Sequence, residues 1–313
     1  MEKRVKQGKK GFLICEIILL ILITISVVGC VFLYGKVNDY KKLEKEYKSD
    51  NKKFSNILKT KEDELNSVQK DLNYYRDLDA TIESIKTEYF ASIKTLEEDI
   101  KSGKSDRKIA YITFDDGPYY NTYRVLDILD ENDVKATFFT ISMNGEYCYD
   151  NKGARCYDLY KEYVKRGHTI ANHTYTHGIR YGLYSSADSF INAIDRQEEH
   201  IKNMTGGYKT NIMRFPGGSS QAGGLKGPIT ERLREKGYGW VDWTAQDGDG
   251  KALYSNEQAW GNIYSSVNDK IEVILLHDYN TVTTNILGDF IKWLKENGYE
   301  CYPLFYDSVM VSK

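Results

Sequence analysis

The stretch Tyr111-Ile112-Thr113-Phe114-Asp115-Asp116-Gly117-Pro118 decides how the C-terminal part of this 313-residue chain folds. The apolar run Ile109–Phe114 predicts a short buried strand, and the Gly-Pro pair after the two aspartates ends it. Two adjacent carboxylates disfavour joint ionisation unless a cation lies beside them. The stretch therefore predicts a strand that delivers Asp115 and Asp116 to the edge of a sheet, next to a metal ion, an arginine or both.

Strands and helices alternate through the region 104–313 that contains this stretch. Apolar runs predict strands at Ile109–Phe114, Ala136–Thr140, Thr169–Ala171, Ile212–Phe215, Gly239–Val241, Val273–Leu276 and Glu300–Pro303. Helical patterns occur at Thr122–Asn132, Tyr157–Lys165, Ser189–Met204, Ile229–Glu235, Glu257–Ser266 and Asn285–Glu296. This alternation predicts a parallel α/β sheet or barrel, somewhat short for eight βα units. We expect its chemistry at the C-terminal strand ends.

Two histidines follow the third predicted strand, in His173-Thr174-Tyr175-Thr176-His177. If this turn is helical, residues four apart share a face and both rings can reach one cation. Imidazole is a ligand of zinc and of other divalent ions, and two histidines with one carboxylate leave coordination positions for water and substrate. Two surface histidines would give the same spacing. With the aspartates nearby, we expect a catalytic metal site.

Two more polar residues follow predicted strands. Arg214 opens Arg214–Gly218, and its guanidinium can keep one aspartate ionised through charge-assisted hydrogen bonds. His277 ends an apolar strand, and a histidine titrates near neutral pH and can act as a general acid. Taken singly, each is equally explained as a surface arginine before a turn or a histidine at a strand end. A carboxylate beside His277 would raise its pKa, and one loop offers Asp242, Asp247 and Asp249, with Trp240 and Trp243 adjacent.

In order and spacing, four motifs resemble those of polysaccharide deacetylases, the fourth carbohydrate-esterase family. They are Thr113–Gly117, His173–His177, Arg214–Gly218 and Leu275–Asp278. The resemblance covers about Lys108–Leu304, and it implies a distorted, incomplete (β/α) barrel that removes acetyl groups from glycans. Four motifs in order are specific for the family and much less specific for the substrate.

The resemblance also implies roles for individual residues. It implies that one divalent metal ion is bound by Asp116, His173 and His177. It implies that Asp115 is the general base steadied by Arg214, that His277 is the general acid, and that Leu275 lines the pocket for the acetyl methyl group. The residues expected to contact substrate are Tyr119, through its backbone N–H, Pro216, Trp243 and Leu275.

One family motif, which pairs an aspartate with a tryptophan, is altered here. Trp243 follows Asp242, whereas Asp249 is followed by Gly250. We favour Asp249 as the partner of His277, with Asp247 next, and leave open which tryptophan forms the wall of the groove.

Composition sets limits on function. The net charge of -2 argues against a nucleic-acid binder that neutralises phosphates. The 26 tyrosines suit stacking on sugars or plain packing equally well. Of the five cysteines, Cys148 and Cys156 are placed to pair in a loop, but an odd number gives no disulfide framework and we expect free thiols.

The N-terminus predicts a membrane anchor. Residues 1–11 are basic, and 12–34 are apolar apart from Glu16, with no charge from Ile17 to Tyr34. Such a run just spans a bilayer, and the preceding basic residues place the N-terminus in the cytoplasm and the rest outside. A cleaved signal peptide is an alternative. So is a lipoprotein signal, because Val27-Val28-Gly29-Cys30 resembles a lipobox. All three export the remaining chain.

Residues 35–103 predict a helical stalk. No glycine or proline lies between Gly35 and Gly103, and apolar residues recur at steps of three and four from Leu65 to Ile100. This seam indicates a coiled coil with interruptions of the heptad. We expect either a spacer or a dimerising helix, and a solvated hairpin or partly disordered stalk is the alternative.

These expectations define a membrane-tethered, exported hydrolase of N-acetylated glycans. The location makes peptidoglycan N-acetylglucosamine the first substrate, with N-acetylmuramic acid, chitin or poly-N-acetylglucosamine next. An O-acetyl esterase on xylan and a non-catalytic glycan-binding surface protein are the alternatives. The expected cofactor is a divalent ion, zinc first, with cobalt, manganese or nickel also compatible. The expected partners are glycan, membrane lipid and a second copy through the stalk.

Overall fold

The computed structural model describes residues 2–142, 157–251 and 255–305, with backbone alone for 2–14, 75, 77–83 and 157. The chain divides into two compact units, Met1–Ile85 and Lys86–Lys313. The suggested pairing of Cys148 with Cys156 lies outside the described residues.

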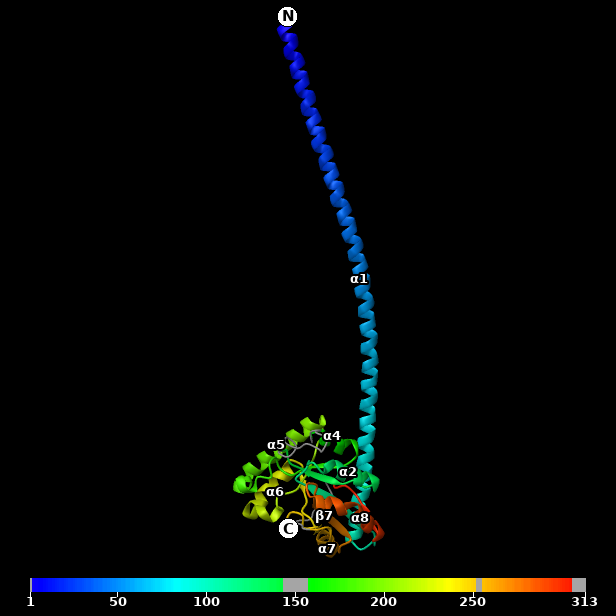
Figure 1. Cartoon of the computed structure of the whole chain (residues 1–313), viewed down its shortest axis with the longest axis vertical. Helices are drawn as coiled ribbons and strands as arrows, with labels where there is room; N and C mark the ends of the chain where they lie inside the picture. The colour runs from blue at the N-terminus through cyan, green and yellow to red at the C-terminus, as the bar shows by residue number, and fades with distance from the viewer. Residues whose placement is uncertain (1, 143–156, 252–254, 306–313) are drawn as a thin grey trace. The chain divides into compact units, whose positions relative to one another are not determined.

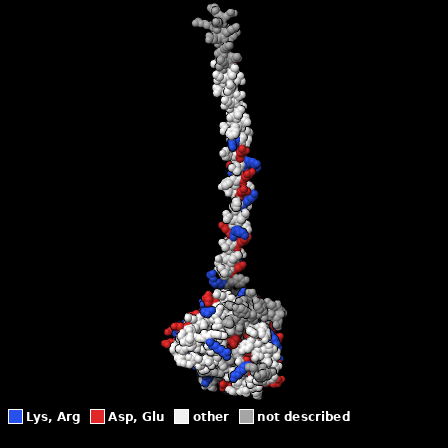
Figure 2. Space-filling view, turned by 60° about the vertical axis from the view of Figure 1, so that its left-hand side comes forward, with Lys and Arg blue, Asp and Glu red and all other residues white. Residues whose placement is uncertain are grey.

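The first unit is helical throughout. Helix α1 runs from Glu2 to Lys101 without a break (Figure 1), which confirms the prediction of a long apolar N-terminal helix. Within Cys15–Tyr74 an 18-residue window reaches a mean hydropathy of 2.9, apolar enough to cross a membrane by length and composition, although a signal sequence passes the same test. Figure 2 shows the stretch of the helix next to its grey end as white, and farther along the same helix side chains of both charge signs appear.

The last turns of α1 belong to the second unit. Ile93, Leu96 and Ile100 are buried and pack in one cluster with Ile109 and Tyr111. The predicted start of the catalytic domain, residue 104, lies after these turns, because a helical seam alone does not distinguish a stalk from a helix that packs on its own domain.

The second unit is built on a parallel sheet. Its strands are β1 Lys108–Asp115, β2 Thr137–Thr140, β3 Thr169–Asn172, β4 Ile212–Met213, β5 Gly239–Trp240, β6 Ala245–Gln246, β7 Ile271–His277 and β8 Tyr299–Cys301. The order is β5-β4-β3-β2-β1-β7-β6, and β8 pairs with β1. All these pairings are parallel, and the sheet curls into a half-barrel, as predicted. Only β6 was not expected among the described strands.

Helices cover the outside of the curled sheet (Figure 1). They are α2 Thr122–Glu131, α4 Tyr157–Lys165, α5 Ala187–Thr205, α6 Lys226–Glu235, α7 Asn256–Ser266 and α8 Thr281–Glu296, with short 3-10 turns η1 Ile179–Tyr181, η2 Leu183–Ser185 and η3 Ser219–Leu225. Side-chain oxygens of Ser186, Ser255 and Asn280 accept backbone N–H groups and cap α5, α7 and α8.

Alternation along β1 explains how the strand serves both the core and the site. Ala110, Ile112 and Phe114 pack in the outer core cluster, which includes residues of α2 and α8. Ile109 and Tyr111 belong to the inner cluster with Phe139 and Val273. Because successive side chains point to opposite faces, Thr113 and Asp115 continue the inner face to the C-terminal end of the strand.

Candidate active site and metal centre

The register of the sheet brings the predicted residues together. Asp115 is the partner of His277 on β7 and of Phe139 on β2, and Thr113 is the partner of Leu275. Parallel strands present their carboxyl ends at one edge, so Asp115 and His277 lie on adjacent strand ends with their side chains on the same face.

Asp116, His173 and His177 form a cluster that can hold one ion. One ligand atom from each lies within 4.8 Å of the other two. Asp116 Oδ1 is 3.6 Å from His173 Nε2 and 3.8 Å from His177 Nε2. His173 Nδ1 lies 2.9 Å from the Arg214 carbonyl oxygen, and since a carbonyl only accepts, Nδ1 carries the proton and Nε2 keeps its lone pair for a metal. The donor set fits a divalent ion with open positions.

The turn that carries the two histidines is not helical. Thr174 and His177 adopt left-handed backbone conformations with φ of 67° and 50°, and Asp116 does so at 68°. The Asn172 side chain accepts the N–H of Thr174 at 2.9 Å. Non-glycine residues in this region carry backbone strain, and such strain concentrates at functional sites. The histidines thus converge through this turn and not through a shared helix face.

Arg214 lies inside the barrel beneath Asp115. The guanidinium is fully buried and stacks over the Phe139 ring at 4.2 Å. Its Nη1 donates to Asp115 Oδ1 at 2.8 Å and to Thr113 Oγ1 at 2.7 Å. Its other bonds go to the carbonyl oxygens of Val241 and Asp242. A buried charge needs a partner of opposite charge, and Arg214 is the partner of Asp115. The second oxygen, Asp115 Oδ2, lies 3.5 Å from His173 Nε2.

His277 faces the same space from β7. Its Nδ1 lies 2.6 Å from Asp249 Oδ1, and its backbone N–H donates to Asp249 Oδ2 at 2.7 Å. Burial alone lowers the pKa of His277, but the hydrogen bond to Asp249 and the charges of Asp249, Asp116 and Asp115 outweigh it and raise the pKa to about 9. With Nδ1 held by Asp249, Nε2 of the ring lies on the side of the metal cluster, 3.8 Å from Asp116 Oδ2.

The other two aspartates of the loop have different partners. Asp242 accepts hydrogen bonds from the backbone N–H and the hydroxyl of Ser219 at 2.8 and 2.6 Å. Asp247 accepts the N–H of Asp249 and contacts the Thr283 hydroxyl. Of the three, Asp249 is the one that the structure places against the His277 ring.

The residues expected to contact substrate have defined neighbours within the domain. Leu275 is buried on β7, two residues before His277 and on the same face. Pro216 is buried, and its carbonyl accepts the Tyr184 hydroxyl. Trp243 lies against Gly218, where an added Cβ would come within 3.2 Å of the indole. The N–H of Tyr119 donates to Thr122 Oγ1 at 2.8 Å, so the donor expected for an oxyanion already has an acceptor.

Asp278, which follows His277, supports the loop after β1. Its carboxylate is buried and accepts the hydroxyl of Thr122. A Cβ added at Gly117 would lie 2.6 Å from Asp278 Oδ2, so only glycine fits against this carboxylate. Burial raises the pKa of Asp278 to about 7.

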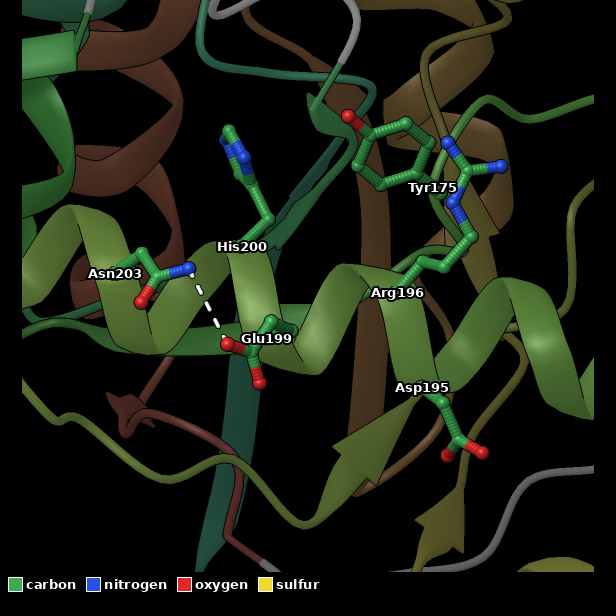
Figure 3. Close-up of a pocket in the computed structure, with 6 residues that line it drawn as sticks. All are labelled: Tyr175, Asp195, Arg196, Glu199, His200 and Asn203. Atoms are coloured by element: carbon green, nitrogen blue, oxygen red, sulfur yellow. Dashed lines mark hydrogen bonds between the residues drawn. The ribbon is translucent and has the colours of Figure 1, made fainter.

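Tyr175, between the two histidines, belongs to a separate groove on α5. The groove has a volume of about 430 Å³ and is lined by Tyr175, Asp195, Arg196, Glu199, His200 and Asn203 (Figure 3). The Arg196 guanidinium stacks on the Tyr175 ring at 4.0 Å. These contacts hold the middle of the histidine turn against α5.

Three residues near the centre were missed in the sequence. Thr113 could have been found, because it lies two residues before Asp115 on the same face of the strand. Ser219 and Thr283 carry no sequence signal, since their roles depend on how a loop and a helix pack against the aspartates.

Comparisons with known proteins agree with this geometry. A family model described as polysaccharide deacetylase matches residues 102–230. A peptidoglycan-N-acetylglucosamine deacetylase of Bacillus cereus is 31% identical over 62% of this chain and 68% of its own length. The chain belongs to the polysaccharide deacetylase family.

Other polysaccharide deacetylases are similarly related. A putative polysaccharide deacetylase of Bacillus subtilis is 34% identical over 61% of this chain, and the chain spans 65% of that relative's length. The solved catalytic domain of a peptidoglycan N-acetylglucosamine deacetylase from Eubacterium rectale superposes with a TM-score of 0.59 at 32% identity, covering 66% of this chain and 93% of that domain. The family and the half-barrel fold are therefore shown, while the substrate is a separate question.

Proposed function

We propose that this protein is a metal-dependent deacetylase that hydrolyses the N-acetyl group of cell-wall glycan, with peptidoglycan N-acetylglucosamine as its substrate. One observation carries the proposal. The ligand atoms of Asp116, His173 and His177 lie within 4.8 Å of one another. Next to them, the paired ends of β1 and β7 present the buried carboxylate of Asp115 and the ring of His277, whose pKa is raised to about 9. Amide hydrolysis needs these three elements: an electrophilic centre, a base for water and an acid for the departing nitrogen.

Asp116, His173 and His177 would hold the metal ion. A divalent ion bound there supplies Lewis acidity, which polarises a carbonyl group and acidifies water. Asp115 Oδ2 lies on this side, while Oδ1 is held by Arg214. The free oxygen of Asp115 takes a proton from the attacking water, and Arg214 holds the other oxygen of this carboxylate in place.

His277 completes the reaction. Its Nδ1–H is fixed by Asp249, so Nε2 faces the cluster and carries the second proton of the imidazolium. It donates that proton to the nitrogen as the C–N bond breaks, and the products are acetate and a free amino sugar.

Leu275 is the apolar surface for the acetyl methyl group, and Trp243 and Pro216 line the sugar side. The role of the Tyr119 N–H toward the oxyanion requires its bond to Thr122 Oγ1 to open when substrate binds. We retain it as a donor because hydrogen bonds at catalytic sites often rearrange on binding.

Location favours the bacterial wall as substrate. The apolar helix, with basic residues before it, supports a single-pass anchor with a cytoplasmic N-terminus and an extracellular catalytic domain at residues 104–313. An enzyme tethered there meets peptidoglycan first. The similarity to peptidoglycan-N-acetylglucosamine deacetylases points the same way.

The test is mass spectrometry of muropeptides and of soluble chitooligosaccharides after incubation with the full chain and zinc. We expect loss of acetyl groups from the N-acetylglucosamine of muropeptides, and unchanged N-acetylmuramic acid. Acetate release from acetylated xylan alone would instead establish an O-acetyl esterase. Absence of acetate from all three substrates would refute a catalytic role.

A further inference from the structure

Three polar side chains meet behind His277, on the side of the ring away from the metal cluster. Asp247 and Asp249 come from the loop after β6, Thr283 from the first turn of α8, and His277 from β7. The Thr283 hydroxyl lies 2.6 Å from Asp247 Oδ2 and 2.9 Å from Asp249 Oδ2. The exposed fractions of Asp247, Asp249 and Thr283 are 0%, 3% and 1%, so all three side chains lie away from bulk solvent.

Counting protons decides how this group is arranged. A threonine hydroxyl has one hydrogen, yet it lies at hydrogen-bond distance from two carboxyl oxygens. That single hydrogen cannot point directly at both oxygens, and both contacts are well formed when one of the carboxyl groups carries a hydrogen of its own. Asp249 accepts from His277 at both oxygens, so it is the carboxylate. Asp247 Oδ1 accepts the N–H of Asp249, which leaves Asp247 Oδ2 to carry the hydrogen.

We propose that Thr283 and a neutral, protonated Asp247 are positioning residues that fix Asp249 behind the general acid His277. The proposal rests on the proposed function. Asp247 Oδ2–H donates to Thr283 Oγ, Thr283 donates to Asp249 Oδ2, and Asp249 Oδ1 accepts the His277 Nδ1–H. The carboxylate cannot rotate without breaking this chain, so the imidazolium keeps Nε2 toward the scissile nitrogen.

The electrostatics of the group agree with a neutral Asp247. Burial, followed by the charge of Asp249, raises the pKa of Asp247 to about 8. The groups that face it are Asp249 from its own loop, the Asn262 amide from α7, which donates to the Asp247 carbonyl at 2.7 Å, and Thr283 from α8. With Asp247 neutral, the two neighbouring carboxyl groups hold one negative charge between them, on Asp249, and the repulsion between two buried like charges is avoided.

Infrared difference spectroscopy on the metal-free full chain tests the protonation. Asp247→Asn keeps the acceptor for the Asp249 N–H and supplies an N–H in place of the O–H. We expect the wild-type minus Asp247→Asn spectrum at about pH 6 to contain a protonated-carboxyl C=O band that disappears as the pH rises through about 8. A difference spectrum that contains only carboxylate bands at about pH 6 would overturn the proposal. This measurement requires neither activity nor a metal.

Steady-state acetate release tests the positioning. Thr283→Val has the same shape without the hydroxyl, and we expect kcat to fall about 10- to 100-fold, the range for losing a hydrogen bond to a charged group, with KM within about twofold. Thr283→Ser should restore kcat. Thr284→Val is the matched control, because Thr284 is equally buried but its hydroxyl donates to Asn280 O within α8.

The outcomes separate this inference from the proposed function. Wild-type kcat in Thr283→Val, or a low kcat that serine does not restore, would refute the positioning role. If the wild type releases no acetate from any glycan, the proposed function fails, and the infrared result still decides the arrangement of Asp247 and Thr283.

Discussion

Replacing Arg214 by methionine should destabilise the catalytic domain strongly. The guanidinium is fully buried and makes four hydrogen bonds, to Asp115, Thr113 and two backbone carbonyls. Methionine fills a similar volume but leaves Asp115, which is 3% exposed, without its positive partner. Breaking a buried pair by removing one partner costs about 3–5 kcal/mol.

The double variant identifies the source of this loss. The loss of stability in Arg214→Met should come from leaving the buried Asp115 carboxylate without a partner. The double variant Asp115→Asn/Arg214→Met should then lose less free energy of unfolding than the sum of the losses of the two single variants, because the effects of changing contacting residues are not additive. Arg232→Met is the control, because Arg232 and its partner Asp188 are both exposed to solvent, and such pairs contribute about 0.2–1 kcal/mol.

Tryptophan fluorescence in urea measures these differences on the full chain. All four tryptophans lie between Trp240 and Trp293, so the signal reports the catalytic domain and not the stalk. The measurement should be made with chelator present, so that a bound cation cannot compensate Asp115. A loss below about 1 kcal/mol for Arg214→Met, equal to that of the control, would refute the assignment of Arg214 as the buried counter-charge of Asp115.

Three further predictions concern the rest of the chain. In urea, the free energy of unfolding of a fragment 86–313 should exceed that of a fragment 104–313 by about 4–9 kcal/mol, an upper estimate from the burial of three apolar side chains of α1. Equal urea midpoints of the two fragments would contradict this prediction. Burial lowers the pKa of His168 to about 4. Between about pH 6.5 and 4 the unfolded chain therefore binds more protons than the folded chain, and the free energy of unfolding should fall as the pH drops. His168→Asn should make this fall less steep, and an unchanged pH dependence would contradict the role of His168. Leu65 and Leu72 are exposed on the stalk. Replacing both by lysine should convert a dimer of the full chain into a monomer, measured by light scattering in detergent, and should leave acetate release unchanged. A wild type that is already monomeric would exclude the coiled-coil dimer.

The strong periodic signals in the sequence predicted most of the fold. The apolar run Ile109–Phe114 and the helical pattern at Ser189–Met204 predict β1 and α5 within a few residues of their observed bounds. Strand β6 has two residues and no pattern of its own, and its pairing with β7 depends on neighbours far away in sequence. The packing of the last turns of α1 on the domain was not predicted for the same reason. The spacing of apolar residues along a helix shows which face is buried, but not which other part of the chain packs against that face.

The site could be predicted as far as strand ends determine it. Asp115, Asp116, His173, Arg214 and His277 each end or follow a strand, and parallel strands bring such residues to one edge. What could not be predicted depends on loop conformation. The left-handed turn at Thr174 and His177 contains no glycine to signal it. The contact of Thr283 with two aspartates arises where α8 packs on a loop.

The central claim is that Asp116, His173 and His177 hold the ion that makes this domain a deacetylase. The most direct test is acetate release from purified peptidoglycan by the full chain, after chelation and again after adding zinc, for the wild type and for His177→Ala, with His200→Ala as the matched histidine control. We expect the chelated wild type and His200→Ala to be inactive and to regain activity with zinc, and His177→Ala to remain at least about 100-fold slower at the same zinc concentration. Undiminished acetate release from the chelated wild type, or from His177→Ala, would contradict the account.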